Sequence, residues 1–152
     1  MNLYSIITAI EHHALTKPGS IALAGEGSQI TYQTLFKDLQ LSNVEFNLQS
    51  AQVVGLAMDN CPCWALLDLK LAYTGIPCVP LPLYFSSSQI LHAIRDAGVD
   101  CVITDQAEAY IALLSSAGFG IVTHHQHEIH GKSFHVLHLS KAQTIRLPGI
   151  TA

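Results

Sequence analysis

The stretch from Val53 to Phe85 constrains the fold of this chain more than any other. Val53 to Met58 is an apolar run, too short for a helix and typical of a strand buried on both faces. Apolar residues then recur at helical spacing over Cys63 to Thr74, and Pro62 suits the first turn of a helix. Cys78 to Leu83 is a second apolar run. This order of strand, helix and strand predicts two parallel strands joined by a helix.

Shorter elements precede this unit. Apolar residues at helical spacing predict a helix over residues 3–14. Strands over 21–24 and 29–31 follow, joined by a turn whose Gly-x-Gly lacks the third glycine and the helix of a dinucleotide-binding loop. A second helix is predicted to begin at Thr31 or Tyr32. Its inward-facing apolar residues are expected to be Leu35, Phe36, Leu39 and, as the last candidate, Val44.

Helices and strands continue to alternate in the second half of the chain. Four further elements are predicted in order: a helix over 87–97, a strand over 100–104, a helix over 105–117 and a strand over 120–123. Ser86 with Gln89 is a plausible capping box for the first helix, and Asp105 with Glu108 for the second. With about four parallel strands, the predicted fold class is α/β: a doubly wound, mostly parallel sheet with flanking helices, plus an N-terminal helix and β-hairpin.

Four histidines and one glutamate cluster in a predicted loop: His124, His125, His127, Glu128 and His130. Imidazoles near a carboxylate are typical ligands of zinc, nickel or copper. The order differs from the His-Glu-x-x-His of a helical zinc site, so neutral loop histidines are favoured and no metal ligand is assigned. An edge strand is predicted over 133–139, on which His135 and His138 face opposite sides.

Composition narrows the classes of function. Only 12% of the 152 residues are charged, against about 25% in an average domain, and mean hydropathy is +0.34. The length suits one domain, and the low charge and high hydropathy indicate either a large core or an apolar face that packs against something else. The net charge is −4 and the seven Lys and Arg residues are scattered, which disfavours nucleic acid as a partner. No apolar run approaches the roughly 20 residues of a membrane helix, and no signal peptide is evident, so we expect a cytoplasmic protein.

No catalytic residue is predicted from the sequence. The serine clusters suit helix ends and lack the Gly-x-Ser-x-Gly pattern of a nucleophile elbow. Asn60 and Asp105 follow predicted strands, where open α/β sheets bind ligands, although turn and capping roles explain them equally well. Packing, rather than a ligand cage, is predicted for Trp64, Tyr73 and Tyr84. Buried free thiols, rather than disulfides or zinc ligands, are predicted for Cys61, Cys63, Cys78 and Cys101.

Several short motifs carry a resemblance to a known family. They are Ile30-Thr31-Tyr32-x-x-Leu35, Asn60-x-Pro62, Tyr73-Thr74-Gly75, Val79-Pro80-Leu81, a helix with Leu91, Ile94 and Asp96, and Val102-Ile103-Thr104-Asp105. In this order they resemble the N-terminal part of the adenylate-forming (AMP-binding) synthetases, of the acyl-CoA synthetase or acyl-AMP ligase type. The resemblance covers most of residues 5–105 and concerns scaffold residues.

The resemblance implies an enzyme that activates a carboxylate with ATP and Mg²⁺, then passes the acyl group to the thiol of coenzyme A or of a carrier protein. The family's phosphate loop, acyl tunnel and catalytic lysine fall beyond this sequence. Lys141-Ala-Gln-Thr144 lacks the glycines that cradle phosphate. The resemblance therefore supplies no catalytic, cofactor-binding or metal residue, and no cofactor is expected in this chain itself.

We expect residues 1–152 to be an N-terminal fragment of a larger AMP-binding domain. Residues 1–50 would hold a helix, a hairpin and a helix, 51–123 a parallel βαβ core, and 124–152 a His-rich loop, an edge strand and a tail. The expected partners are the phosphate-loop lobe and C-terminal domain of the parent chain, or a second copy through an exposed apolar face. Alone, the fragment would be inactive. A free-standing α/β binding or interaction module and a small complete enzyme remain as alternatives.

Overall fold

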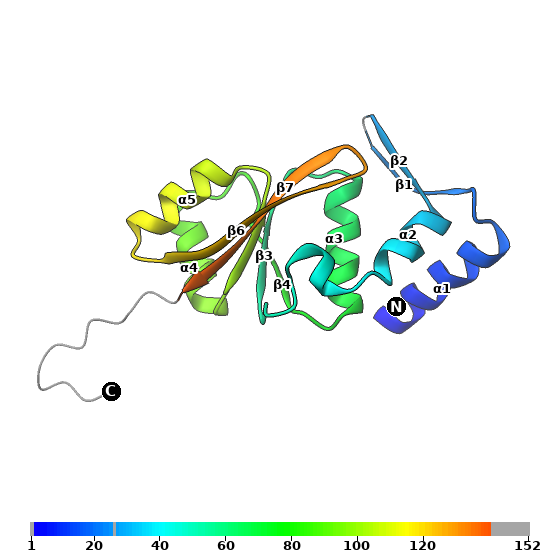
Figure 1. Cartoon of the computed structure of the whole chain (residues 1–152), viewed down its shortest axis with the longest axis horizontal. Helices are drawn as coiled ribbons and strands as arrows, with labels where there is room; N and C mark the ends of the chain where they lie inside the picture. The colour runs from blue at the N-terminus through cyan, green and yellow to red at the C-terminus, as the bar shows by residue number, and fades with distance from the viewer. Residues whose placement is uncertain (1, 26, 141–152) are drawn as a thin grey trace, which may run out of the picture.

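The computed structural model describes residues 2–25 and 27–140 and centres on a mixed five-stranded sheet with strand order β4-β3-β5-β7-β6 (Figure 1). A separate two-stranded hairpin, β1-β2, lies near the N-terminus. The helices and strands are, in chain order, α1 (Leu3–Thr16), β1 (Ile21–Gly25), β2 (Ser28–Thr31), α2 (Tyr32–Leu39), the 3-10 turn η1 (Asn43–Phe46), β3 (Val54–Ala57), α3 (Pro62–Tyr73), β4 (Cys78–Pro80), α4 (Ser87–Ala97), β5 (Cys101–Thr104), α5 (Ala107–Ser116), β6 (Gly120–Ile129) and β7 (Lys132–Ser140).

The predicted βαβ unit is confirmed. β3 pairs in parallel with β4 on one side and with β5 on the other, so that Leu56 lies opposite both Pro80 and Ile103. The second strand of the unit is shorter than the predicted run, because Pro80 and Pro82 have no backbone N–H to donate to a neighbouring strand. In the described part of the chain, no helix is both long and apolar enough to cross a membrane.

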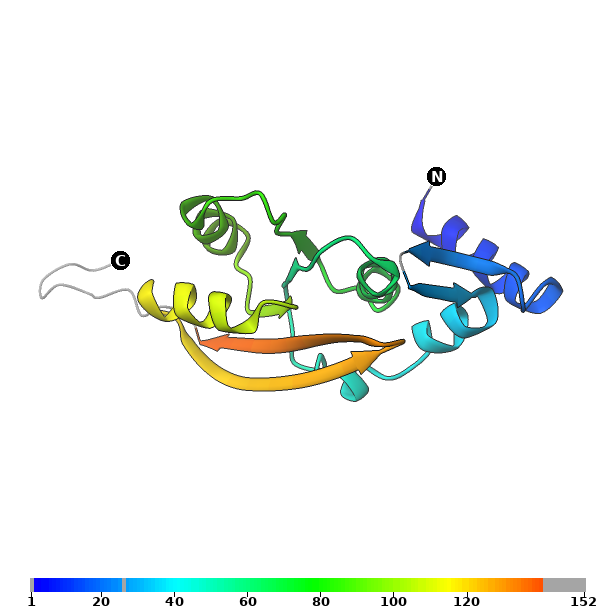
Figure 2. The ribbon, with the colours of Figure 1, turned by 90° about the horizontal axis from the view of Figure 1, so that it is seen from above.

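The prediction of a fourth parallel strand over 120–123 is wrong. β6 runs antiparallel to β7, and β7 in turn runs antiparallel to β5. His130 and Gly131 join β6 to β7 with φ angles of 49° and 81°, the left-handed conformation that tight hairpin turns require. The long hairpin is seen in Figure 2. As a result β7 is an interior strand, not the predicted edge strand, and β6 and β4 form the two edges.

β3 and β5 are buried on both faces of the sheet, which explains the continuous apolar character of these two strands. On one face, Val54 and Leu56 join the α3-side core, which also holds buried residues of α1, α2 and α3. On the other face, Ala57 joins the α5-side core, which holds Ile94 of α4 and Tyr110 and Leu114 of α5. The predicted fold class, α/β with helices flanking a sheet, is confirmed.

The two predicted capping boxes have different outcomes. Before α4 the box is present: the backbone N of Ser86 donates to Gln89 Oε1 at 2.8 Å, and the N of Gln89 donates to Ser86 Oγ at 3.2 Å. Before α5 the prediction is wrong. The N-cap residue is Gln106, which makes no side-chain cap, and its own backbone N donates to Thr104 Oγ1 at 2.9 Å. The carboxylate of Asp105 is engaged elsewhere, as described below.

A buried lysine ends α2 in a way that the sequence did not indicate. Lys70 of α3 is fully buried, and its Nζ donates to the backbone oxygens of Asp38 at 3.2 Å, Leu39 at 3.4 Å and Leu41. The ammonium also lies 5.4 Å from the ring centre of Phe46. These contacts satisfy carbonyls that a helix end leaves without donors. Burial lowers the pKa of Lys70, while Asp38 opposes the shift.

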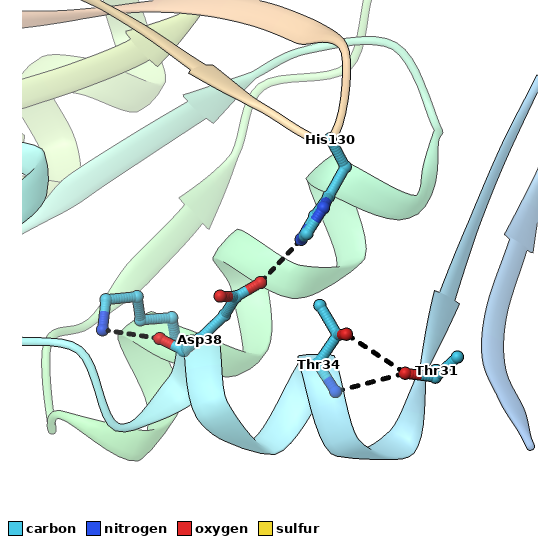
Figure 3. Close-up of polar contacts among 5 residues, drawn as sticks. Thr31, Thr34, Asp38 and His130 are labelled. Carbon is cyan, nitrogen blue, oxygen red and sulfur yellow. Dashed lines mark hydrogen bonds and ion pairs between the residues drawn. The ribbon is translucent and has the colours of Figure 1, made fainter. Parts of the chain in front are cut away.

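The chain after α2 departs from the prediction at Val44. Helix α2 stops at Leu39, and η1 follows with Phe46 buried instead. Val44 is therefore 60% exposed and does not face inward. The start of α2 is as predicted: Thr31 is the N-cap, and its Oγ1 accepts a hydrogen bond from the backbone N of Thr34 at 3.2 Å (Figure 3).

Candidate functional site

A cavity of about 340 Å³ opens at the carboxyl ends of β3 and β4, where open α/β sheets bind ligands. We call it the strand-end cleft. Its walls come from the end of β3, the start of α3 and the loop after β4. The lining residues are Leu56, Met58, Asp59, Asn60, Trp64, Pro80, Leu81, Pro82, Leu83 and Tyr84.

The turn from β3 into α3 supplies the polar wall of the cleft. The backbone N of Asn60 donates to Asp59 Oδ1 at 2.9 Å, which holds the turn, and both side chains lie at the surface. Cys61 is the N-cap of α3, its Sγ accepting from the backbone N of Trp64 at 3.4 Å, and Pro62 occupies the first helical turn. The turn role predicted for this segment is confirmed, and the exposed Asn60 side chain lines the cleft.

The apolar wall is formed by the loop after β4. Tyr84 is 84% exposed and Leu83 is 48% exposed, whereas Trp64 is half-buried against the α3-side core. The packing role predicted for Trp64 is confirmed. The same prediction is wrong for Tyr84, and also for Tyr73, which is 41% exposed at the end of α3.

This arrangement favours binding over catalysis. Among the described lining residues, Asp59 is the one ionisable acid, and none is histidine, cysteine, lysine or arginine. An apolar floor with an exposed aromatic ring and one amide can hold a partly apolar molecule by contact and a few hydrogen bonds. It does not place a nucleophile beside a base.

Asp105, the other strand-end candidate, lies in a different cavity. Its Oδ2 accepts from Lys132 Nζ at 2.9 Å, and this hydrogen bond raises the pKa of Lys132. Its Oδ1 is buried without a hydrogen-bond partner. The cavity beside it has a volume of about 610 Å³ and is lined by Asp105, Gln106, Ala107, Glu108, Ala109, Ile111, His124 and His135. Asn60 and Asp105 therefore do not form one site.

The predicted histidine loop is in fact the second half of β6 and its turn. The alternation of a strand sends neighbouring histidines to opposite faces. His127 Nε2 donates to Asn47 Oδ1 at 2.8 Å, His130 Nε2 lies 2.6 Å from Asp38 Oδ2 (Figure 3), and His124 faces His135. Within residues 2–25 and 27–140, no three His, Cys, Asp or Glu side chains gather as a metal-binding group.

His135 and His138 face opposite sides of β7, as predicted. His138 Nε2 donates to the backbone O of Asn47 at 2.6 Å on the α3 side, whereas His135 contacts His124 on the α5 side. Asn47 accepts from two histidines of the hairpin and adopts a left-handed φ of 56°, a role that no sequence pattern indicated.

The four cysteines are free thiols, as predicted, but the predicted burial is confirmed only for Cys63 and Cys101 and is wrong for Cys61 and Cys78. Cys63 and Cys101 are buried, whereas Cys61 and Cys78 are partly exposed. Burial raises the pKa of Cys63, Cys78 and Cys101 to about 12, so these three thiols remain protonated and poorly nucleophilic at neutral pH.

Comparison with known proteins assigns the chain to a family. A model of the family described as "AMP-binding enzyme" matches residues 10–144, most of the chain. The chain belongs to the AMP-binding enzyme family. The match includes α2, the strand-end cleft and the β6–β7 hairpin. The segment Lys141–Thr144, which the sequence excluded as a phosphate loop, lies outside the described residues. None of the curated proteins searched matches the chain.

Solved structures show the same fold for this AMP-binding chain. The N-terminal subdomain of NpsA from Klebsiella oxytoca is 18% identical, with a TM-score of 0.58 over 66% of this chain and 27% of that one. The same subdomain in complex with 3-hydroxyanthranilyl-AMSN is 20% identical, with a TM-score of 0.57 over 72% of this chain and 30% of that one. A mutant form of coronafacic acid ligase from Pectobacterium brasiliense is 20% identical, with a TM-score of 0.62 over 76% of this chain and 24% of that one. The chain thus spans less than a third of each of these structures.

Proposed function

We propose that this chain is the N-terminal scaffold of an ATP-dependent ligase that forms acyl-adenylates. The parent enzyme would join a carboxylate to ATP, giving acyl-AMP and pyrophosphate, and then transfer the acyl group to the thiol of coenzyme A or of a carrier protein. The observation that carries this proposal is the family match over residues 10–144. The acyl-CoA synthetase or acyl-AMP ligase type and a role in fatty acid metabolism are parts of the proposal that rest on the resemblance of the sequence motifs. A cytoplasmic location is also part of the proposal and rests on the expectation from the apolar runs and the N-terminal sequence.

ATP and Mg²⁺ do not fit the strand-end cleft. A triphosphate with its metal is held by backbone amides, lysine or arginine side chains and carboxylates. The described lining residues include no cation and one carboxylate, Asp59. We therefore assign no part of ATP binding and no step of the reaction to this cleft. In this proposal the chain supports a site whose reacting groups come from the rest of the parent polypeptide, and alone it has no ligase activity.

The proposed partner is the rest of the parent chain. The solved relatives are three to four times longer than the part they share with this chain. Exposed apolar side chains offer places for such a partner or for a second copy to pack. They are distributed over several elements: Leu3, Tyr4, Leu15, Ile21, Leu41, Val44, Tyr73, Leu83, Tyr84 and Val122.

Two measurements test the proposal. Titration calorimetry of the chain alone with ATP, with and without a fatty acid, should give no saturable heat. A polypeptide translated from the same gene beyond codon 152 should catalyse carboxylate-dependent exchange of pyrophosphate into ATP. Clear ATP binding by the chain alone would contradict the claim that the nucleotide site lies elsewhere in the parent enzyme. A stop codon directly after residue 152 would favour the free-standing α/β binding module, which the two well-formed cores make physically reasonable.

A further inference from the structure

The strongest unassigned feature is a pair of histidines on the β6–β7 hairpin. His124 Nε2 lies 2.8 Å from His135 Nδ1, and the two ring centres are 5.0 Å apart with the planes inclined by 50°. The pair faces the cavity of about 610 Å³ beside the start of α5. It belongs neither to the strand-end cleft nor to the contacts that join the hairpin to α2 and η1.

The pairing register of the β6–β7 hairpin places these two side chains on the same face, and a β-bulge adds Ile121 to that face. Register shifts between Ile121 and Thr123, so that Ile121 lies opposite Leu139 but His124 lies opposite Leu137. Without the extra residue, Ile121 and His124 would point to opposite faces, because side chains alternate along a strand. With it, Ile121 and His124 both face α5. His124 lies opposite Leu137 and is therefore the diagonal neighbour of His135, whose direct partner is Gln126.

We propose that His124 and His135 form a two-histidine binding site for a divalent transition-metal ion of the zinc or copper class. Neutral imidazole nitrogens are preferred ligands of these ions. Zn–N bonds of about 2.0–2.1 Å at a tetrahedral angle place the two nitrogens about 3.3 Å apart, roughly half an ångström more than the present separation. Small side-chain rotations in both rings supply this opening.

The hydrogen bond between the two rings is compatible with metal binding. At 2.8 Å one ring nitrogen donates its proton and the other accepts it, so the accepting nitrogen already presents the lone pair that a metal ion needs. The ring that now donates moves its proton to its other nitrogen when the metal binds, so no net charge is lost or gained. Ligands must be deprotonated, and acid therefore competes with the metal.

The surroundings of the pair suit a metal site in which the protein supplies only part of the coordination. Glu108 lines the same cavity, and Asp105 is already paired with Lys132. Because no described group of three protein ligands exists, water or a small anion completes the coordination of the ion. The cavity leaves room for such ligands. A metal across the two strands would also tie the exposed edge strand β6 to β7.

Titration of the whole chain with Zn²⁺ tests the proposal. We expect saturable 1:1 binding by calorimetry and a melting temperature that rises with Zn²⁺ concentration. His124→Ala and His135→Ala should each weaken binding by about tenfold or more, as loss of a ligand does. His125→Ala is the matched control, because it is the next residue on β6 but points to the α3 side, and it should leave binding within about twofold.

A second measurement does not depend on how the variants fold. Electron paramagnetic resonance of the wild-type chain with one equivalent of Cu²⁺ should show coupling to two imidazole nitrogens. The proposal is overturned if Zn²⁺ shows no saturable binding, if the copper signal reports a number of nitrogens other than two, or if His125→Ala weakens binding as much as His135→Ala. The last result would mean that the metal is held adventitiously by dispersed histidines.

Discussion

Replacing Lys70 by methionine tests whether this buried lysine holds the end of α2. Methionine keeps an unbranched, flexible side chain of similar length but has no ammonium group. In the wild type, the Nζ of Lys70 donates to carbonyl oxygens of Asp38, Leu39 and Leu41. The variant leaves these acceptors without that donor, while it removes a charge that is fully buried.

The magnitude follows from these two opposing effects. A buried acceptor that loses its donor costs about 1–3 kcal/mol. Leu39 is fully buried, so its carbonyl bears that whole cost, whereas Leu41 lies at the surface and water can replace the lysine there. Removing the ammonium recovers part of its desolvation penalty, and the lowered pKa of Lys70 shows that burial does oppose the charge. We expect a net loss of about 2 kcal/mol in the free energy of unfolding.

Urea unfolding followed by far-ultraviolet circular dichroism measures this loss, provided the m-value is unchanged. Lys37→Met is the matched control, because Lys37 lies exposed in the last turn of α2, and it should change stability by less than about 0.5 kcal/mol. If Lys70→Met is as stable as the wild type or more stable, the lysine is merely tolerated in the core and does not cap α2.

Two further predictions use the same unfolding assay. Gly55→Ala should lower the free energy of unfolding by about 1–3 kcal/mol, since a Cβ on Gly55 would lie 2.8 Å from Leu81 Cδ1. Gly19→Ala is the control: it has open space around it and should change stability by less than about 0.5 kcal/mol. Equal effects of the two substitutions would contradict the packing argument. The pKa of His127 is lowered by burial and then by His125, so the unfolded chain binds a proton at higher pH than the folded chain does. Stability from this residue is therefore present above pH 6.5 and lost as the pH falls below it, and His127→Gln should lose less stability than the wild type between pH 7.5 and pH 5.5. An identical loss in both proteins would exclude His127 as the source.

The parallel half of the sheet could be predicted because its signals are local. The βαβ unit has short apolar runs, a proline at the start of α3 and glycines at helix ends, and each of these acts within a few residues. Gly98 shows the principle: it ends α4 in the left-handed conformation with a φ of 69°, as its position after the helix indicates. The capping box of α4 is equally local, because Ser86 and Gln89 are three residues apart and hydrogen-bond to each other.

The antiparallel half could not be predicted because its partners are distant in sequence. Residues 120–123 look the same whether they pair in parallel with β3 or β5, or fold back on β7. The deciding feature is the two-residue turn at His130 and Gly131, and histidine is an uncommon residue for a left-handed φ. Asp105 was assigned to a helix cap for the same reason, because its true partner, Lys132, follows 27 residues later.

The candidate site was predicted only in part. The sequence placed Asn60 at a strand end, and the structure puts it in a cleft. Packing is expected for Tyr84 because large aromatic side chains are usually buried, but the residue lies in the loop after β4 and its ring is exposed. Aromatic character alone does not indicate on which side of a loop a residue will lie.

The histidine-rich segment shows how one local composition serves several purposes once the chain folds. His127 and His138 both donate to Asn47, and His130 contacts Asp38, so the hairpin near the C-terminal end of the described chain is bound to the α2–η1 region. The α3-side core spans the same distance, with Ile10 and Phe134 in one cluster. Packing therefore joins the first 50 residues to the last strands, which is consistent with a family match that begins at residue 10 and continues to residue 144. His124, on the opposite face, takes no part in these contacts, and this leaves it available for the pairing with His135.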